Sequence, residues 1–513
     1  MAREVLMALR RVQEFADARR LTYYVVGGLL RDQWLGRPLG DAASGRRPPP
    51  VNIDLAVARG AVAQARELAA HLGGSFVPLD EAHGTARVVL PSSEAMPRVE
   101  LDLSDFRGPT LEQDLARRDF TINAMAVALA DWLRSPQAPA PFIDPLDGRH
   151  ALAARRLCAC FAGTFEEDPV RILRAFRFAA QLGFSMEASL EALMARAVAG
   201  LGRVAGERLR DELLALFATD AAGEAVASLG RLGALDVLFP ELVQGRGVDQ
   251  GDFHHLDVFE HQVEAVRQAD QILASCAEFT EPLQRALLPY TAEAFVERRS
   301  RKSLIKLSVL FHDVGKPANR QVHPDGEIWF IGHEHTGAEL VGPITERLRL
   351  ANREARMVVA LVRHHLRPGF LSREPELTRR AIYRFYRELE DDGPACGLAW
   401  WADRLATRGP RSRVDQVDQQ RERLEEILRP YFFKVEDIVR PPRLVDGCRL
   451  MQELQVPSGP LIGELLALIE EAQAEGRVRT AEEALALARA TQSARGGKAP
   501  PPGRGRGEPN RSS

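Results

Sequence analysis

Two apolar segments between residues 23 and 57 constrain the fold of this chain more than any other part of its sequence. The first reads as a short strand that runs into the pair Gly27-Gly28 and then into a helix start. A glycine pair lets backbone N–H groups approach a bulky anion, and a helix start adds N–H donors and the positive end of the helix dipole. The second segment reads as a strand with Asn52 and Asp54 on one face, because side chains two apart point the same way. The pattern predicts a site for a nucleoside triphosphate and Mg²⁺.

Two later segments extend this pattern. Residues 98–102 read as an alternating strand that places Glu100 and Asp102 on one face. Residues 114–124 read Asp-Leu-Ala-Arg-Arg-Asp-Phe-Thr-Ile-Asn-Ala. With the glycine loop Gly-Gly-Leu-Leu-Arg-Asp at residues 27–32, these segments resemble the motifs of the class II tRNA nucleotidyltransferase and bacterial poly(A) polymerase family.

The resemblance implies a catalytic head in which Asp54, Asp102 and Asn52 hold Mg²⁺. Asp102 is preferred to Glu100 because it matches the family's acid just before the Phe-Arg-Gly step. The resemblance also implies that nucleotide binding involves the glycine turn and the charged residues near it, which are Gly27, Gly28, Arg31, Arg118 and Asp119.

Asn52 departs from the family pattern, which is Asp-x-Asp. An asparagine can ligate Mg²⁺ through its carbonyl oxygen, but it contributes no charge. Residues 36–50, just upstream, are rich in Gly, Pro and Arg and read as a loop insertion. Asp41 in this insertion is a candidate substitute ligand.

A basic stripe follows in the next part of the chain. Arg171, Arg174 and Arg177 recur every three residues on a helix that begins near residue 165, a pattern that a solvated helix face also shows. The same stretch resembles the family's Glu-Asp-x-x-Arg motif. That resemblance implies that Asp168 and Arg171 select the incoming base, while Arg174 and Arg177 face the triphosphate or the base. A carboxylate accepts from the exocyclic amine that C and A both carry, and an arginine donates to the ring acceptor beside it.

Most of the 12 histidines lie between residues 254 and 365. Their order resembles the HD superfamily of metal-dependent phosphohydrolases. The resemblance implies a divalent metal, such as Mg, Mn, Ni, Co or Fe, on His261, His312, Asp313 and Asp403. His333 and His365 would allow a second metal, with His365 preferred to its neighbour His364. Core or surface positions remain open for the other histidines of this region, His254, His255, His323 and His335.

The whole chain sets broad limits on these expectations. Its 513 residues predict several domains, and its formal net charge of −3 means that RNA binding must come from local basic faces. The five cysteines show neither a disulfide framework nor zinc-site spacing, which fits a reducing cytoplasm. The sequence shows no signal-peptide pattern and no apolar run long enough to span a bilayer.

The expected fold class is α+β: a polymerase-β-like mixed sheet followed by a mainly helical body. The expected domains are a nucleotidyltransferase head at 1–141, a helical neck with the base-recognition motif at 142–248, an all-α HD domain at 249–410, a helical body at 411–490 and a disordered basic tail at 491–513.

The resemblance implies addition of CCA to tRNA 3′ ends from CTP and ATP with Mg²⁺ in the cytoplasm. Poly(A) or A-only addition stays open, because the base-selecting pair accepts A in each case. Since Asn52 weakens the acidic cluster, a phosphohydrolase with a decayed head is a further alternative. An RNA-binding protein without activity is another.

Overall fold

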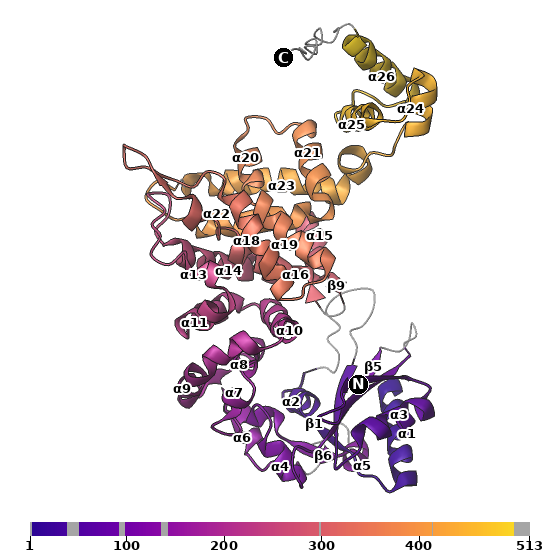
Figure 1. Cartoon of the computed structure of the whole chain (residues 1–513), viewed down its shortest axis with the longest axis vertical. Helices are drawn as coiled ribbons and strands as arrows, with labels where there is room; N and C mark the ends of the chain where they lie inside the picture. The colour runs from indigo at the N-terminus through magenta and orange to yellow at the C-terminus, as the bar shows by residue number, and fades with distance from the viewer. Residues whose placement is uncertain are drawn as a thin grey trace, which may run out of the picture. The chain divides into compact units, whose positions relative to one another are not determined.

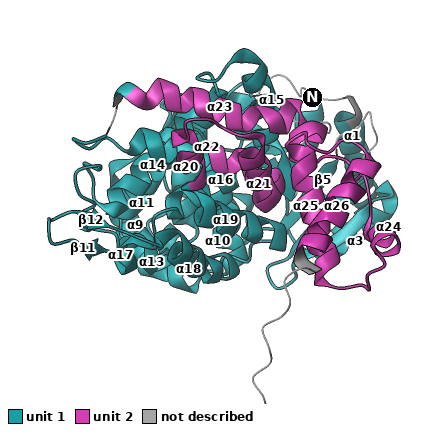
Figure 2. Ribbon diagram, turned by 90° about the horizontal axis from the view of Figure 1, so that it is seen from above, with its two compact units in different colours: residues 1–366, 398–415 teal, residues 367–397, 416–513 magenta. Residues whose placement is uncertain are grey.

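The computed structural model describes residues 3–37, 51–91, 98–134, 142–296, 299–412 and 414–496. The candidate ligand Asp41, with almost all of the predicted insertion, lies outside the described residues. The chain divides into two compact units, coloured separately in Figure 2. The first holds residues 1–366 and 398–415, and the second holds residues 367–397 and 416–513.

The head is built on a six-stranded mixed sheet with the order β3-β4-β5-β2-β1-β6. Strands β1, β5 and β6 of this sheet are labelled in Figure 1. Its strands are β1 (Tyr24–Val26), β2 (Val51–Val57), β3 (Ser75–Asp80), β4 (Thr85–Leu90), β5 (Val99–Asp105) and β6 (Ala126–Ala128). The pair β2–β5 is parallel, and the other described pairs of this sheet are antiparallel. In β2 the apolar Val51, Ile53 and Leu55 are buried and alternate with the half-buried Asn52 and Asp54.

The helices of the head are α1 (Arg3–Arg19), α2 (Gly28–Trp34), α3 (Ala61–Leu72), α4 (Leu111–Ala116) and α5 (Leu129–Arg134), with a 3-10 turn η1 (Thr121–Asn123). Helix α3 buries Ala65, Leu68 and Leu72 and packs against β3, β4 and β5. It ends at Gly73, whose φ of 69° lies in the left-handed region that glycine adopts without strain.

Strand register places four residues in one row across the sheet. Arg87 on β4 pairs with Asp102 on β5, Asp102 pairs with Asp54 on β2, and Asp54 pairs with Val26 on β1. Directly opposite residues on paired strands point to the same face. The row therefore brings two carboxylates and one arginine beside the turn that follows Val26.

The neck is helical, as expected, apart from one small strand pair. Its first helices are α6 (Gly148–Ala153), α7 (Thr164–Glu167), α8 (Arg171–Leu182) and α9 (Ala188–Ala197). They are followed by η2 (Val198–Arg203), α10 (Gly206–Phe217), α11 (Ala222–Arg231), α12 (Ala234–Leu238) and α13 (Pro240–Val243). The strands β7 (Arg156–Leu157) and β8 (Ser185–Met186) form a parallel pair that the sequence analysis did not predict. Helix α8 buries Ile172, Leu173 and Phe176, and it packs against α10.

The histidine-rich region consists of long helices and two short hairpins. The helices are α14 (Val258–Ser275), α15 (Glu281–Ala292), α16 (Arg301–Phe311), α17 (Lys316–Asn319), α18 (His333–Arg347), α19 (Asn352–His364) and α22 (Gly393–Ala406). The hairpins pair β9 (Ala294–Val296) with β10 (Arg299–Ser300), and β11 (Gln321–Val322) with β12 (Ile328–Trp329). These short hairpins are additions to the helical domain that the sequence analysis did not predict. Helix α22 crosses from the second unit into the first at Leu398.

The second unit contains α20 (Arg367–Arg373), α21 (Arg379–Leu389), α23 (Val417–Phe433), α24 (Gly447–Leu454), α25 (Pro460–Ala474) and α26 (Ala481–Gly496). Helix α23 buries Leu424, Ile427 and Leu428. Helix α26 continues through residues 491–496, which the sequence analysis assigned to a disordered tail. The remainder of that predicted tail lies outside the described residues.

Within the described ranges, none of the helices combines the length and apolarity that crossing a membrane requires. The mixed-sheet head and the helical remainder confirm the expected α+β class.

Candidate functional site

One cavity of about 580 Å³ lies between the head and the neck, within the first compact unit. Its lining is dominated by arginines and by acidic or amide side chains. They include ten residues that the sequence analysis selected, which are Gly27, Gly28, Arg31, Asn52, Asp54, Arg118, Asp119, Asp168, Arg171 and Arg174. Arg177 also lines it. Of the predicted head and neck site residues, only Asp102 does not contribute to the lining.

The turn between β1 and α2 brings backbone against the acidic cluster. Gly27 has φ 74° and ψ −136°, a conformation that side-chain-bearing residues rarely adopt. A Cβ atom there would lie 3.1 Å from Oδ2 of Asp54 and 3.8 Å from Nη1 of Arg118. Glycine at this position therefore lets the turn, the carboxylate and the arginine come together.

Asp54 is the less compensated of the two acids in the row across the sheet. Burial, followed by the charge of Asp102, raises the pKa of Asp54 to about 6. The described structure gives the Asp54 side chain no hydrogen bond or ion pair, whereas the Asp102 side chain is bonded through both oxygens. Glu100 is buried and forms ion pairs with Arg87 and Arg98 at 2.9 and 3.0 Å, so it does not face the cavity as a free ligand.

The donor set of the head fits a hard divalent cation. Asn52 donates from Nδ2 to Oδ2 of Asp102 at 3.2 Å, and its carbonyl Oδ1 is buried without a bonding partner among the described residues. An unpartnered buried oxygen is costly unless something binds it. This oxygen lies on the same face as the Asp54 carboxylate, and Mg²⁺ prefers such oxygen ligands.

The arginines of α8 are not a solvated stripe, which was the alternative reading of their spacing. Arg174 bonds Oδ2 of Asp119 through Nε at 2.9 Å and Nη2 at 2.7 Å, and it reaches Oε1 of Glu212 through Nη1 at 2.9 Å. Arg177 bonds the other Glu212 oxygen at 2.6 Å. Burial opposes ionisation of Asp119, but Arg174 outweighs it, and the pKa of this carboxyl falls to about 2. The two acids therefore fix the direction of the two guanidinium groups.

Similar pairs hold two further arginines of the cavity, Arg118 and Arg31. Arg118 bonds Oδ2 of Asp114 at 3.0 Å, four residues earlier on the chain. Arg31 bonds Oδ1 of Asn123 at 2.9 Å and the carboxylate of the adjacent Asp32.

The sequence analysis did not select Asp114, Asn123 or Glu212. The signal for Asp114 was its spacing of four from Arg118, which suits a helical ion pair. Asn123 lies in the segment at residues 114–124, which the sequence analysis matched to a motif without giving Asn123 a role. Glu212 lies on α10, to which the sequence analysis assigned no site residue.

The two residues expected to select the base do not face each other closely. Arg171 is buried and donates from Nη1 to Oγ1 of Thr164 at 2.9 Å, while its Nε lies 3.8 Å from Oδ2 of Asp168. Asp168 instead accepts from Nη2 of Arg208 at 2.7 Å. Arg208, at the start of α10, is thus a further cavity residue that the sequence analysis did not select.

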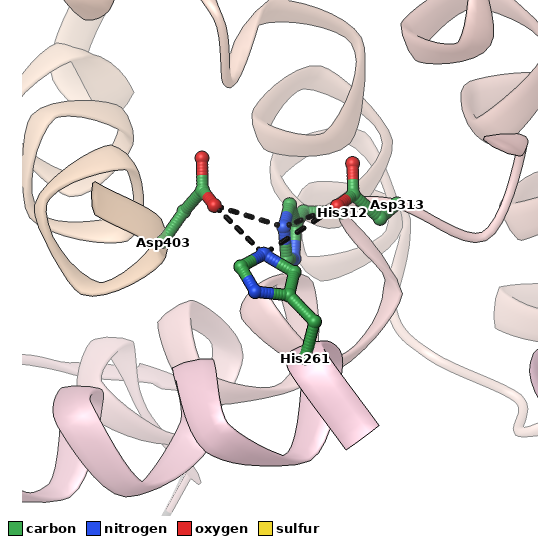
Figure 3. A group of neighbouring side chains, drawn as sticks. All are labelled: His261, His312, Asp313 and Asp403. Atoms are coloured by element: carbon green, nitrogen blue, oxygen red, sulfur yellow. Dashed lines mark hydrogen bonds and ion pairs between the residues drawn. The ribbon is translucent and has the colours of Figure 1, made fainter. Parts of the chain in front are cut away.

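The predicted metal ligands of the histidine-rich region converge from separate helices. Figure 3 shows His261, His312, Asp313 and Asp403 pointing toward one another. Nε2 of His261 lies 2.9 Å from Oδ1 of Asp403, and Nε2 of His312 lies 3.1 Å from Oδ2 of Asp313. Within this group one potential ligand atom per residue lies within 4.8 Å of each of the others.

A second group shares Asp313 with the first. Oδ1 of Asp313 lies 3.2 Å from Nε2 of His333 and 3.7 Å from Nε2 of His365. His365, not the adjacent His364, belongs to this group. The two groups together hold all six residues that the sequence analysis selected, and the shared carboxylate suits two neighbouring metals.

Backbone carbonyls set the direction of three imidazoles. Nδ1 of His312, His333 and His365 each lies 2.7 Å from the carbonyl oxygen three residues earlier, at Val309, Phe330 and Val362. A carbonyl accepts only from a protonated nitrogen, so Nδ1 carries the hydrogen and Nε2 presents its lone pair to the cluster. This is the tautomer that a metal needs.

The other histidines of this region lie outside both groups. His254 packs edge-on against His261 with ring centroids 4.6 Å apart, and burial, with Lys316 and His261 acting in the same direction, lowers the pKa of His254 to about 2. His323 stacks on Trp329, and His255 and His335 are exposed. These positions agree with the non-ligand reading that their sequence context left open.

Models of four known domains match successive parts of the chain. The Poly A polymerase head domain matches residues 23–158, and the RNA and SrmB-binding site of polymerase A matches residues 183–244. The HD domain matches residues 258–408, and tRNA nucleotidyltransferase domain 2 matches residues 410–488.

Relatives match the chain almost from end to end. The A-adding tRNA nucleotidyltransferase of Deinococcus radiodurans is 35% identical, covering 90% of this chain and 94% of that protein. The CC-adding tRNA nucleotidyltransferase of Thermus thermophilus is 33% identical, covering 90% and 92%. Among solved structures, the Thermotoga maritima CCA-adding enzyme complexed with tRNA has the same fold, with a TM-score of 0.57, 21% identity and 96% of each chain covered.

The fold and the cavity define a nucleotidyltransferase with a polymerase head, joined to an HD domain whose acids and imidazoles suit divalent metals. This chain belongs to the tRNA nucleotidyltransferase family. The family, the fold class and the enzyme class expected from the sequence are confirmed, which argues against the non-enzymatic alternative.

The pKa of Asp54 predicts a pH-dependent cation affinity in the head. A cation binds the ionised carboxylate, so affinity should be constant well above pH 6 and fall by about tenfold per pH unit below it. Mn²⁺ titration between pH 5 and pH 8 measures this affinity, with the Asp54→Asn variant subtracted as the background. An affinity that stays constant from pH 8 down to pH 5 would contradict the prediction.

Sharing of Asp313 predicts an unequal effect of ligand substitutions on bound metal. Asp313→Asn should remove the whole metal content of the HD domain, because both groups use this carboxylate. Asp403→Asn and His365→Ala should each remove only part of it. Metal analysis of desalted protein checks this, with His335→Ala as the exposed control. Wild-type metal content in Asp313→Asn would refute a shared ligand.

Proposed function

We propose that this chain completes the CCA end of tRNA by adding C and A residues from CTP and ATP. The observation that carries the proposal is the single cavity in which the glycine turn and Asp54 face the base-selecting Asp168 and the fixed arginines. The reaction joins the terminal 3′-oxygen of the RNA to the α-phosphorus of the nucleotide and releases pyrophosphate. A cytoplasmic location follows from these substrates.

In this proposal Asp54, with Asn52 and Asp102 beside it, is the Mg²⁺ site. When bound, the cation lowers the pKa of the attacking hydroxyl and offsets charge on the leaving pyrophosphate. Gly27 and Gly28 give the triphosphate room at the backbone. Arg31, Arg118, Arg174 and Arg177 supply positive charge, and their buried acid and amide partners hold them in place before the nucleotide arrives.

Base selection is assigned to Asp168 with Arg171. A carboxylate accepts from the amine at C4 of cytosine or C6 of adenine, whereas G and U present a carbonyl there. Because Oδ2 of Asp168 is bonded to Arg208, this pair orients the carboxylate toward the incoming base.

Addition of A alone or of CC alone is the second candidate, because relatives named for each activity match with similar identity. Three tRNA acceptors distinguish these functions: one lacking CCA, one ending in C and one ending in CC. CCA addition predicts that CTP extends the first two by C residues and that ATP extends only the third. Failure to use CTP would leave A-only or poly(A) addition, and failure on the third acceptor would leave CC addition.

The same assay tests the base-selecting residue. Asp168→Ala should lose about tenfold to a hundredfold in preference for CTP over UTP, the size expected for one lost base contact. Arg196→Ala is the matched control, since Arg196 lies 3.9 Å from Glu166 and does not line the cavity. Unchanged preference in Asp168→Ala would assign base selection to another residue.

A phosphohydrolase activity of the HD domain remains a further candidate, supported by the two ligand groups that share Asp313. The divalent ion for this site would be Mg, Mn, Ni, Co or Fe, the metals that mixed imidazole and carboxylate ligands accept. Hydrolysis of a 2′,3′-cyclic phosphate at an RNA end to a terminal phosphomonoester, abolished in His312→Ala while CCA addition persists, would establish it as a second activity.

A further inference from the structure

The acidic cluster of the head contains one arginine for which the sequence motifs gave no role. Arg87 on β4 bonds Asp102 in a bidentate manner, with Nε to Oδ1 at 2.7 Å and Nη2 to Oδ2 at 2.9 Å. Its remaining amino group lies 2.9 Å from Glu100. Strand register places Arg87 directly opposite Asp102, so the pair is a fixed feature of the sheet.

Asp102 therefore has no oxygen free of bonds. Oδ1 accepts from Arg87, and Oδ2 accepts both from Arg87 and from Nδ2 of Asn52. A carboxylate held by a guanidinium and an amide is a poor ligand for a cation until those donors leave. Among the described residues of the cluster, Asp54 and the unpartnered Oδ1 of Asn52 provide the protein oxygens that remain.

The charge of the cluster leads to the same conclusion. Nucleotidyl transfer with two metal ions places two divalent cations about 3.5–4 Å apart, and carboxylates must offset their repulsion. Here Asn52 contributes no charge, and the positive charge of Arg87 cancels one of the two carboxylates in the row. One divalent cation, completed by phosphate oxygens and water, suits such a cluster better than two.

We propose that the head binds a single divalent cation on Asp54 and Asn52, and that Arg87 is a positioning residue that withholds Asp102 from it. The fixed guanidinium supplies positive charge at the place where a second cation would otherwise lie. Arg87 thus compensates for the asparagine at position 52. This inference rests on the proposed nucleotidyl transfer and specifies its metal requirement.

The number of bound Mn²⁺ ions tests this inference without turnover. Mn²⁺ bound per chain is measured by electron paramagnetic resonance with CTP present and no RNA acceptor. Each protein is compared with a counterpart that also carries Asp54→Asn. The number of Mn²⁺ ions bound by the head is the difference between the two counts, because the ions bound by the HD domain contribute equally to both. We expect a difference of one ion for the wild type and of two ions for the Asn52→Asp/Arg87→Met double variant.

Single variants separate the two residues. Arg87→Met should tighten Mn²⁺ binding by at least tenfold, because Asp102 becomes available to the first cation. Arg98→Met is the matched control and should change nothing, since Arg98 pairs with Glu100 and has no bond to Asp102. Arg87→Lys keeps the charge without the bidentate geometry and should give an intermediate affinity. If Arg87→Met does not fold, Arg87→Lys combined with Asn52→Asp is used to count the bound ions instead.

Two results would overturn the inference. One is a difference of two ions in the wild type. The other is a pair of findings: the folded double variant binds no more Mn²⁺ ions than the wild type, and the Mn²⁺ affinity of Arg87→Met or Arg87→Lys equals that of the wild type. The ion count does not depend on extension of tRNA. If the protein never incorporates CTP or ATP, the proposed function is refuted. The number of ions bound by the head is still measured separately, because it needs no turnover.

Discussion

The hydrogen-bonded register of four strands in the head governs the chemistry that this protein can perform. Because β1, β2, β5 and β4 are neighbours, Asp54 lies between the glycine turn on one side and Asp102 on the other. Arg87 closes the same row. A shift of one residue on any strand would send its side chain to the opposite face of the sheet. The sheet therefore fixes both the ligand and the groups that tune its charge.

The cavity beside this row uses buried acids to hold arginines in place. Arg174 forms ion pairs with Asp119 and Glu212, and Arg177 forms one with Glu212. Arg118 is held by an ion pair with Asp114. An arginine that is already oriented loses less conformational entropy when a phosphate binds, which favours binding. The acids offset part of the positive charge of the arginines. Their main effect on phosphate binding is therefore to orient the guanidinium groups and not to strengthen the electrostatic attraction.

The HD domain follows a related principle with different chemistry. Carbonyl oxygens one helical turn back hold three imidazoles in the tautomer that exposes Nε2. Asp313 then connects two ligand groups that come from separate helices. In both the acidic cluster of the head and the ligand groups of the HD domain, backbone geometry thus orients side chains that are far apart in the sequence.

The sequence by itself determined the identity of the chemical groups. The glycine turn, Asp54, the Arg-Arg-Asp segment and the ordered histidines were all readable as motifs, and the alternation of apolar residues predicted the strands that carry the acids. Local periodicity and residue type contain this information, because it concerns neighbours along the chain.

Only the tertiary structure decided how these groups are paired. Arg87 is 15 residues from Asp102, and Arg174 is 38 residues from Glu212. Neither pair follows from spacing along one helix or strand. Strand register joins the first pair and the packing of α8 on α10 joins the second. The burial that raises the pKa of Asp54 is likewise a property of the packed sheet, because desolvation depends on what surrounds a side chain in space.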